Sequence, residues 1–396
     1  MNAPATRIAV VGGSIAGCAM ALAAHRGTPA AGEVTVFERS LGELQDRGVG
    51  VGIHSALCQE LLAEDYLDPR TPYVRLAGRK WITSDGDSYG GKVVGYQDFP
   101  FRAYNWGSLW QALRDRIPPG VEYRTRRVVS VAETPDDAVV TFADGTDERF
   151  DVVLGADGYR SAVRSAMFPE VRPRYAGYLL WRGTLPVSDL PEQDGLWEPH
   201  EAVGVAFPGG HLIMYLIPGR SGTPALNWAL YSAPPAGLGP RWDDPTSLPQ
   251  GGVDAALFDH FDSLGENMPP YWREMLARMP REEILAQPIY DLCVPACATG
   301  RLALVGDAAA VARPHTGRGA VKAVQDAVTI QSALNRGMDW PGALRAYAEQ
   351  RGPVNRSLVE LGRVLGDATV LDPPDWREMD QAGFGRWWAD AIGRWT

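Results

Sequence analysis

A glycine-rich segment near the start of the chain, GGSIAG at Gly12–Gly17, has the spacing of a loop that binds a dinucleotide pyrophosphate, except that Ser14 replaces the middle glycine. Glycines at these positions let the backbone turn tightly and approach a phosphate, and the following helix supplies N-terminal amides. Alone, the segment fits a nucleotide site and an ordinary turn about equally well. The expected contact residues are Gly12, Gly13, Ser14, Ile15, Ala16 and Gly17.

An acidic residue favours the nucleotide interpretation. Glu38 lies 21 residues after Gly17, at the end of a predicted strand, where a carboxylate can accept hydrogen bonds from ribose hydroxyls. Because a carboxylate disfavours a 2′-phosphate, we expect the unphosphorylated adenosine ribose of FAD or NAD, with Arg39 in the same site.

A second motif, GADGYRSAVR at Gly155–Arg164, follows another predicted buried strand. Asp157 is its candidate cofactor residue. The alternative is a simple strand-to-helix turn, in which Asp157 caps the helix and pairs with Arg164.

A third motif spans Leu302–Ala327, where a buried strand ends at Gly306-Asp307 and a turn then opens a helix. Asp307 is placed to accept hydrogen bonds from ribityl hydroxyls. The helix start would present its amides to a ring that carries negative charge, as a reduced flavin does. The turn contributes the candidate residues Pro314, Gly317 and Gly319.

The elements around these motifs indicate an α/β fold with a Rossmann-like, glutathione-reductase-type FAD-binding domain and a second, mostly antiparallel β-sheet domain for the substrate. We expect a discontinuous FAD domain at 1–72, 99–172 and 280–370. The β-rich domain would take 73–98 and 173–279, with an exposed loop at Gly237–Gly252, and 371–396 would form a helical tail that caps the core or a partner.

The three motifs, in this order, resemble the single-component FAD-dependent aromatic hydroxylases, the para-hydroxybenzoate-hydroxylase-like flavoprotein monooxygenases. The segments YAGYLLWRG, GGHLIMYLIPG and GDAAAVARPHTGRG are most similar to the 2,6-dihydroxypyridine 3-monooxygenase branch, with FAD-dependent urate hydroxylases as a second relative.

The resemblance implies FAD held by the glycine loop, Glu38, Asp157 and Asp307, with Arg47 and Gly52 beside the isoalloxazine ring. It also implies that NADPH or NADH reduces the flavin and that O2 then forms a flavin hydroperoxide that hydroxylates an aromatic or N-heteroaromatic molecule. Besides Ser14, the chain departs from the family pattern at two further positions. Ala310 stands where many members have histidine, and Trp106 where an arginine is usual.

The resemblance places the substrate pocket between the two domains, where four residues are catalytic candidates. His211 and Tyr215 are four apart on a predicted strand, so both point to one face, with His211 as base and Tyr215 as an orienting hydrogen-bond partner. The alternative is that both pack on the other side of the sheet. Arg182 would bind a substrate carboxylate or carbonyl, the alternative being a salt bridge, and His315 lies in the flavin turn.

The composition argues against several classes of protein. The net charge of −10 argues against a nucleic-acid surface, and no apolar stretch is long enough to cross a membrane. The spacing of the four cysteines fits no metal site, so we expect free thiols and a cytoplasmic protein, with a homodimer as one candidate state. Two other functions stay open: natural-product tailoring by epoxidation, Baeyer–Villiger insertion or oxidative decarboxylation, and non-catalytic nucleotide binding.

Overall fold

In the computed structural model of the chain, a six-stranded sheet carries the glycine loop. Its order is β16 (Ala298–Thr299), β17 (Leu302–Leu304), β10 (Val152–Gly155), β1 (Thr6–Val11), β2 (Gly32–Glu38) and β6 (Glu122–Thr125). β16 is antiparallel to β17 and the other pairs are parallel. Four consecutive apolar residues of β1, Ile8–Val11, are buried, as expected for a parallel strand that is covered on both faces.

The structure describes residues 5–27, 32–40, 49–192, 195–219, 222–235 and 253–392. Arg47, the predicted loop Gly237–Gly252 and the last four residues of the expected tail, 393–396, lie outside these ranges.

A small three-stranded sheet covers part of the parallel sheet. It is formed by β7 (Val128–Glu133), β8 (Ala138–Phe142) and β9 (Asp147–Phe150). Phe142 and Phe150 contact Phe37 of β2 edge-on, with ring centroids 4.9 and 5.7 Å apart. These aromatic pairs fix the small sheet next to the strand that ends at Glu38.

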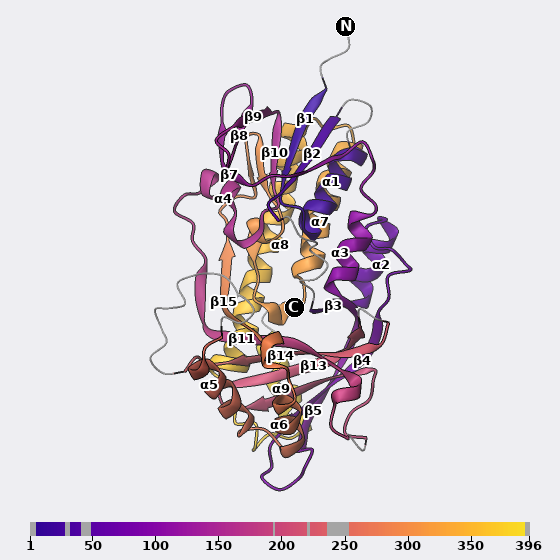
Figure 1. Cartoon of the computed structure of the whole chain (residues 1–396), viewed down its shortest axis with the longest axis vertical. Coiled ribbons are helices and arrows are strands. Elements are labelled where there is room, and N and C mark those ends of the chain that lie inside the picture. Colours follow the sequence, from indigo (N-terminus) through magenta and orange to yellow (C-terminus); the bar gives the residue numbers. More distant parts are fainter. Residues whose placement is uncertain are drawn as a thin grey trace.

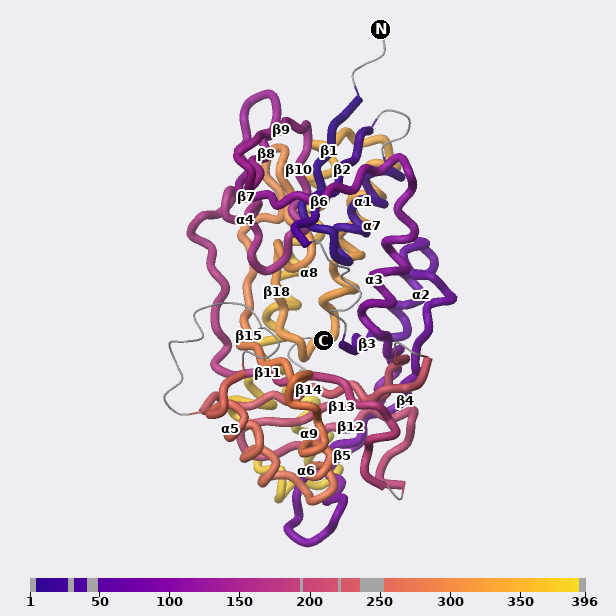
Figure 2. Tube along the Cα trace, in the orientation of Figure 1, coloured from indigo at the N-terminus to yellow at the C-terminus, as the bar shows by residue number. Residues whose placement is uncertain are grey.

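A nine-stranded, mostly antiparallel sheet forms the other end of the elongated molecule (Figure 1). Its strands, in order, are β18 (Ala310–Val311), β15 (Leu285–Cys293), β11 (Arg174–Pro186), β14 (Pro224–Ser232), β13 (Gly210–Pro218), β12 (Glu201–Phe207), β4 (Val74–Thr83), β5 (Lys92–Asn105) and β3 (Gly50–His54). Together the two sheets confirm the predicted fold class. The large sheet takes strands from several parts of the sequence, because the chain passes back and forth between the two sheets (Figure 2).

The helices lie around and between the sheets (Figure 1). They are α1 (Ile15–Gly27), α2 (Ser55–Ala63), α3 (Trp106–Arg114), α4 (Ala162–Met167), α5 (Ala255–Gly265), α6 (Pro270–Ala277), α7 (Gly319–Asn335), α8 (Trp340–Gly366) and α9 (Gln381–Ile392). Within the described residues, no helix is long and apolar enough to cross a membrane.

Alternation along the strands gives the large sheet two different faces. On one face Trp181, Met214 and Trp228 pack against the apolar sides of α5 and α6. The intervening residues, among them Arg182 and His211, face a cavity instead.

The segment Tyr123–Glu133 contains two strands, since β6 joins the parallel sheet and β7 the small one, and Phe150–Leu154 is likewise divided between β9 and β10. The region 173–279, which was predicted to be β-rich, also contains the helices α5 and α6. Leu257, Phe261 and Leu264 are buried at helical spacing, and Asp254 caps α5 by accepting a hydrogen bond from the Leu257 amide at 2.9 Å.

The tail helix α9 caps the cavity-side face of the large sheet. Trp376 stacks on Trp81 of β4 with centroids 5.5 Å apart, and Phe384 and Trp387 contact the same indole. The Gln381 side chain accepts a hydrogen bond from the Tyr96 amide and donates one to its carbonyl. This end of the chain therefore covers the core, as one of the two expectations had it.

Candidate functional site

Two adjoining cavities, each of about 620 Å3, extend from the glycine loop to the large sheet. The loop cavity is the one lined by Gly12, Gly13 and Glu38. The sheet cavity is the one lined by residues of the large sheet, among them His211 and Tyr215. Residues that line both are Ser14, Val49, Trp106, Ala156, Gly158 and Arg182. Because six residues line both, the two cavities lie side by side, one against the glycine loop and the other against the large sheet.

Close packing explains the glycines of the loop. Gly12 has φ +103°, and a Cβ there would lie 2.4 Å from the Ala156 carbonyl oxygen. A Cβ at Gly17 would lie 1.8 Å from the Gly12 oxygen. Ser14 differs, because it is only half-buried and faces both cavities. A serine is therefore accommodated at this position without distorting the turn.

Hydrogen bonds hold the loop in place. The Gly13 amide donates to the Glu38 carboxylate at 2.8 Å, and its carbonyl accepts from Trp110 Nε1 at 2.9 Å and Tyr123 Oη at 3.1 Å. Glu38 and the exposed Arg39 line the loop cavity, where both were predicted. Ile15 and Ala16 line the sheet cavity from the first turn of α1.

Asp157 combines a capping role with an unsatisfied oxygen. Its Oδ2 accepts from the Ala162 amide at 2.6 Å, whereas Oδ1 is buried without a hydrogen-bond partner among the described residues. Burial raises the pKa of this carboxyl. The alternative pairing with Arg164 does not form at ion-pair distance in the described chain, because Arg164 instead donates to the carbonyls of Ala308 and Tyr159.

A buried ionic cluster positions Gly306 and Asp307. The Gly306 amide donates to Asp326 Oδ2 at 3.0 Å, and its carbonyl accepts from Lys322 Nζ at 2.6 Å. Arg351 pairs with the other oxygen of Asp326 at 2.8 Å. Asp307 then projects into the sheet cavity, where surrounding protein atoms raise the pKa of its carboxyl.

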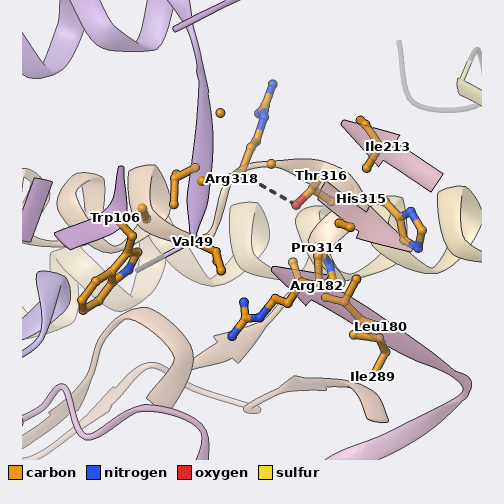
Figure 3. A pocket seen from close by; sticks show the side chains of 18 of the residues that line it. Val49, Trp106, Leu180, Arg182, Ile213, Ile289, Pro314, His315, Thr316 and Arg318 are labelled. Carbon is orange, nitrogen blue, oxygen red and sulfur yellow. Dashed lines mark hydrogen bonds between the residues drawn. The ribbon is translucent and has the colours of Figure 1, made fainter. Parts of the chain in front are cut away.

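The third motif places a helix N-terminus at the cavity. Gly317 has φ +61° and ends the turn Pro314–Thr316, and α7 begins at Gly319 without a side-chain cap. Arg318 lies beside Thr316, and the Arg318 amide donates a hydrogen bond to Thr316 Oγ1 at 3.4 Å (Figure 3). Pro314, Gly317 and Gly319 all line the sheet cavity. The first amides of α7 are thus available to a negatively charged group, as predicted.

The predicted strand residues lie on the cavity side. His211 and Tyr215 both line the sheet cavity, so the alternative, in which they pack on the opposite face, is wrong. His211 is 3% exposed, and its Nδ1 has no partner in the described structure. Burial, followed by the nearby Arg79, lowers the pKa of His211 to about 3. His211 is therefore neutral at physiological pH.

His315 lies beside His211, in the turn Pro314–Thr316. Its ring centroid is 5.5 Å from that of His211 and 4.2 Å from that of Tyr231, and its Nε2 is 2.9 Å from Tyr178 Oη. Burial lowers the pKa of His315 well below its usual value. The large sheet and the third motif thus meet in one neutral, aromatic cluster.

Arg182 extends from β11 toward Val49 and Trp106 (Figure 3). No salt bridge to it is found among the residues that the structure describes, and its Nε is buried without a partner. Burial lowers the pKa of its guanidinium. The alternative of a structural salt bridge is therefore not observed.

The two remaining departures from the family pattern differ in consequence. Trp106 opens α3 and lines both cavities, so an indole replaces a cation there. Ala310 is 1% exposed in β18, opposite Cys293, and does not line either cavity. Gly52 of β3 lines the sheet cavity, and its place beside the isoalloxazine ring stays a prediction.

Several lining residues were missed by the sequence analysis. These are Arg79, Trp81, Phe99, Tyr231 and Trp388. Alternation along β14 could have identified Tyr231. The others reach the cavity only through the pairing of β4 with β5 and β12 and the docking of α9, which no local pattern reveals.

The residues present fit a bound FAD. The glycine loop leaves backbone where a Cβ would clash, Asp157 offers an unpaired buried oxygen, and α7 presents uncapped amides. A Rossmann-like domain with these features, joined to a large antiparallel sheet, defines a flavin-dependent oxidoreductase.

Comparison with known proteins narrows this class. The model of a family described as FAD binding domain matches residues 272–361. The chain is 30% identical over 392 residues to a 3-amino-4-hydroxybenzoate 2-monooxygenase of Streptomyces platensis, covering 95% of this chain and 92% of the relative. It is 29% identical over 361 residues to a 2,6-dihydroxypyridine 3-monooxygenase of Paenarthrobacter nicotinovorans, covering 88% and 87%.

A solved structure agrees with these similarities. The 2,6-dihydroxypyridine-3-hydroxylase from Arthrobacter nicotinovorans superimposes with a TM-score of 0.81 at 26% identity, covering 93% of this chain and 94% of the other. The chain belongs to the FAD-dependent aromatic hydroxylases, and FAD is its cofactor. The prediction of a FAD-dependent monooxygenase is confirmed.

Proposed function

We propose that this protein hydroxylates a small aromatic or N-heteroaromatic ring that already carries a hydroxyl group. The adjacency of the two cavities carries the proposal, because their common lining places the glycine loop next to an aromatic-lined space on the large sheet. When bound, FAD supplies the redox chemistry, because NADPH or NADH can reduce it and the reduced form activates O2 for transfer of one oxygen atom.

The cofactor would be held by groups whose geometry is already formed. The glycine loop, Glu38 and Asp157 line the loop cavity and would bind the ADP half. Asp307 and the first turn of α7 line the sheet cavity and would bind the ribityl chain and the ring. Trp106 offers an apolar wall between the two parts.

Within the sheet cavity, we assign His211 the hydrogen bond to the substrate hydroxyl. Its Nδ1 has no partner in the described structure and is shielded from solvent, so a hydroxyl that reaches it meets no competing water. With a pKa near 3, His211 accepts a hydrogen bond but does not store a proton. It therefore raises electron density on the ring by polarising the O–H bond rather than by full deprotonation.

Three further side chains would orient the ring. Tyr215 would form a hydrogen bond to it, and Arg182 would bind an anionic or carbonyl oxygen. His315 is held by a hydrogen bond with Tyr178, and its ring lies close to that of Tyr231 with a small tilt. It would therefore form the wall of the cavity at the turn Pro314–Thr316.

The names of the relatives divide into two kinds of substrate. The Streptomyces platensis enzyme is named for a hydroxybenzoate, which carries a carboxylate, and the Paenarthrobacter enzyme for a dihydroxypyridine, which does not. At 29–30% identity the similarity favours neither kind for this chain.

The test is substrate-dependent oxidation of NADH and NADPH across hydroxypyridines, hydroxybenzoates and purines, with products identified by mass and NMR. We expect a yellow protein that either nicotinamide donor bleaches without oxygen, and a product one oxygen atom heavier than its substrate. A colourless protein that FAD cannot reconstitute would refute the proposal.

We also propose a cytoplasmic location, since the four cysteines are free thiols, three of them buried, as a reducing compartment permits. The homodimer stays a prediction, which sedimentation of the purified protein tests.

A further inference from the structure

Arg79 is a cation without an acidic partner in the sheet cavity. It lies on β4 and donates through Nε and Nη2 to Gln97 Oε1, at 3.2 and 3.0 Å. Its guanidinium carbon lies 4.5 Å from the centre of the Trp81 ring, 5.3 Å from Phe99 and 5.4 Å from Trp388. No carboxylate lies within ion-pair distance of Arg79 in the described part of the chain.

The charges that line the sheet cavity are unbalanced. Among the described lining residues the cations are Arg79, Arg182 and Arg318, and the one carboxylate, Asp307, belongs to the turn assigned to the cofactor. The adjacent His211 and His315 are neutral, as derived above. A ring bound against the large sheet therefore meets positive charge without a neighbouring acid.

Keeping this partly buried guanidinium without a counter-ion costs free energy. Burial lowers the pKa of Arg79 to about 9, so the group is still charged near neutral pH. A buried charge is normally paired, and an unpaired one leaves a desolvation cost that a bound counter-ion removes. The surrounding rings hold the guanidinium in one orientation, which prepares its planar fork for an oxygen anion.

The position of Arg79 separates it from the cofactor phosphates. It lines the sheet cavity but not the loop cavity, which contains the glycine loop. Its guanidinium instead lies over Trp81 and Phe99, at the part of the sheet cavity that is lined by aromatic residues of the large sheet.

We infer that the substrate is an aromatic anion and that Arg79 binds its negatively charged oxygen group. This inference rests on the proposed hydroxylase function and specifies the substrate class of the same site. The anionic oxygen belongs to a ring carboxylate or to an ionised ring hydroxyl, and the two sources bind through the same chemistry.

The experiment measures ligand binding to the FAD-loaded protein by the change in flavin absorbance. The probes are 4-hydroxybenzoate, its neutral analogue 4-hydroxybenzamide, and 2,6-dihydroxypyridine from pH 6 to pH 8. The variants are Arg79→Met and Arg79→Lys. Arg75→Met is the matched control, because Arg75 is an exposed residue of the same strand that does not line either cavity.

We expect the wild-type protein to bind an anionic ring at least about tenfold more tightly than the neutral amide, since hydrogen bonds between two charged groups are stronger than those to a neutral acceptor. Arg79→Met should lose that preference, Arg79→Lys should retain part of it, and Arg75→Met should behave as wild type. If the group is a carboxylate, hydroxybenzoate binds equally well from pH 6 to pH 8, where Arg79 stays charged. If it is an ionised hydroxyl, dihydroxypyridine affinity rises with pH as the ligand ionises.

Equal binding of 4-hydroxybenzoate, dihydroxypyridine and the neutral amide by the wild-type protein would overturn the inference, even if Arg79→Met fails to fold. So would an Arg79→Met variant that keeps the wild-type preference. Hydroxylation of neutral rings alone would refute this inference and leave the proposed function intact. If no aromatic compound of any charge stimulates NAD(P)H oxidation, the proposed function itself fails.

Discussion

Replacing Asp326 with alanine tests whether the buried ionic cluster holds the Gly306-Asp307 turn in place. Asp326 is fully buried and accepts hydrogen bonds from the Gly306 amide at 3.0 Å, Lys322 at 3.4 Å and Arg351 at 2.8 Å. The substitution removes the only carboxylate that these two cations contact at ion-pair distance within the described chain.

The expected cost is large because two buried cations lose their partner at once. The side chains of Lys322 and Arg351 are 1% and 10% exposed, so little water can replace the carboxylate. Breaking a buried ion pair by removing one partner costs about 3–5 kcal/mol. Part of this loss of folding free energy comes from the Gly306 amide, which no longer has a hydrogen-bond acceptor. Because the turn is then held less firmly, Asp307 is less well positioned and FAD affinity should fall at least about tenfold.

Urea unfolding followed by circular dichroism, with and without FAD, measures both effects. Asp326→Asn is the matched variant, since it keeps the shape and one acceptor for the Gly306 amide but loses the charge. It should lose less FAD affinity than Asp326→Ala. A loss of less than about 1 kcal/mol in Asp326→Ala, together with unchanged FAD binding, would show that the cluster does not position the turn.

Three other predictions concern the site. Gly12→Ala should abolish FAD retention, measured as flavin absorbance after gel filtration, because its Cβ would lie 2.4 Å from the Ala156 oxygen at φ +103°; a yellow variant would contradict this. Asp307→Ala should weaken FAD binding more than His211→Ala, and the assignment of His211 is wrong if its variant changes neither turnover nor substrate affinity. Burial lowers the pKa of His211 from 6.5 to about 3, so below pH 6.5 the unfolded chain binds a proton that the native protein excludes. The free energy of unfolding should therefore fall as the pH drops from 6.5 to 4, by up to about 1.4 kcal/mol per pH unit for this residue. His315 adds to the fall in the same direction. His211→Gln should show a smaller decrease in urea titrations at pH 7 and pH 5, and an identical decrease would contradict the pKa argument.

The sequence predicted those parts of the site that local chemistry determines. The glycine loop, Glu38 and Asp307 follow short strands at fixed spacing, so each motif could be identified without knowing its neighbours. Their convergence on one pair of cavities is what the structure adds.

The rest of the site depends on contacts between distant segments. Arg79 reaches the cavity because β4 pairs in parallel with β12, where Arg79 lies opposite Ala202. Helix α5 was missed because prolines and glycines dominate the surrounding sequence, although its apolar residues have helical spacing. Pairing of distant strands leaves no such local signal.

The docking of α9 has a consequence for how new specificities can arise in this protein. Trp388 borders the sheet cavity and stacks near Arg79, yet it belongs to a helix outside the strand ladder that supports the rest of the wall. A smaller side chain at this position would enlarge the space around a ring, and Trp388 forms no part of the strand pairing. Substitutions at Trp388 are therefore a direct way to change the shape of the sheet cavity while leaving the residues assigned to FAD unchanged.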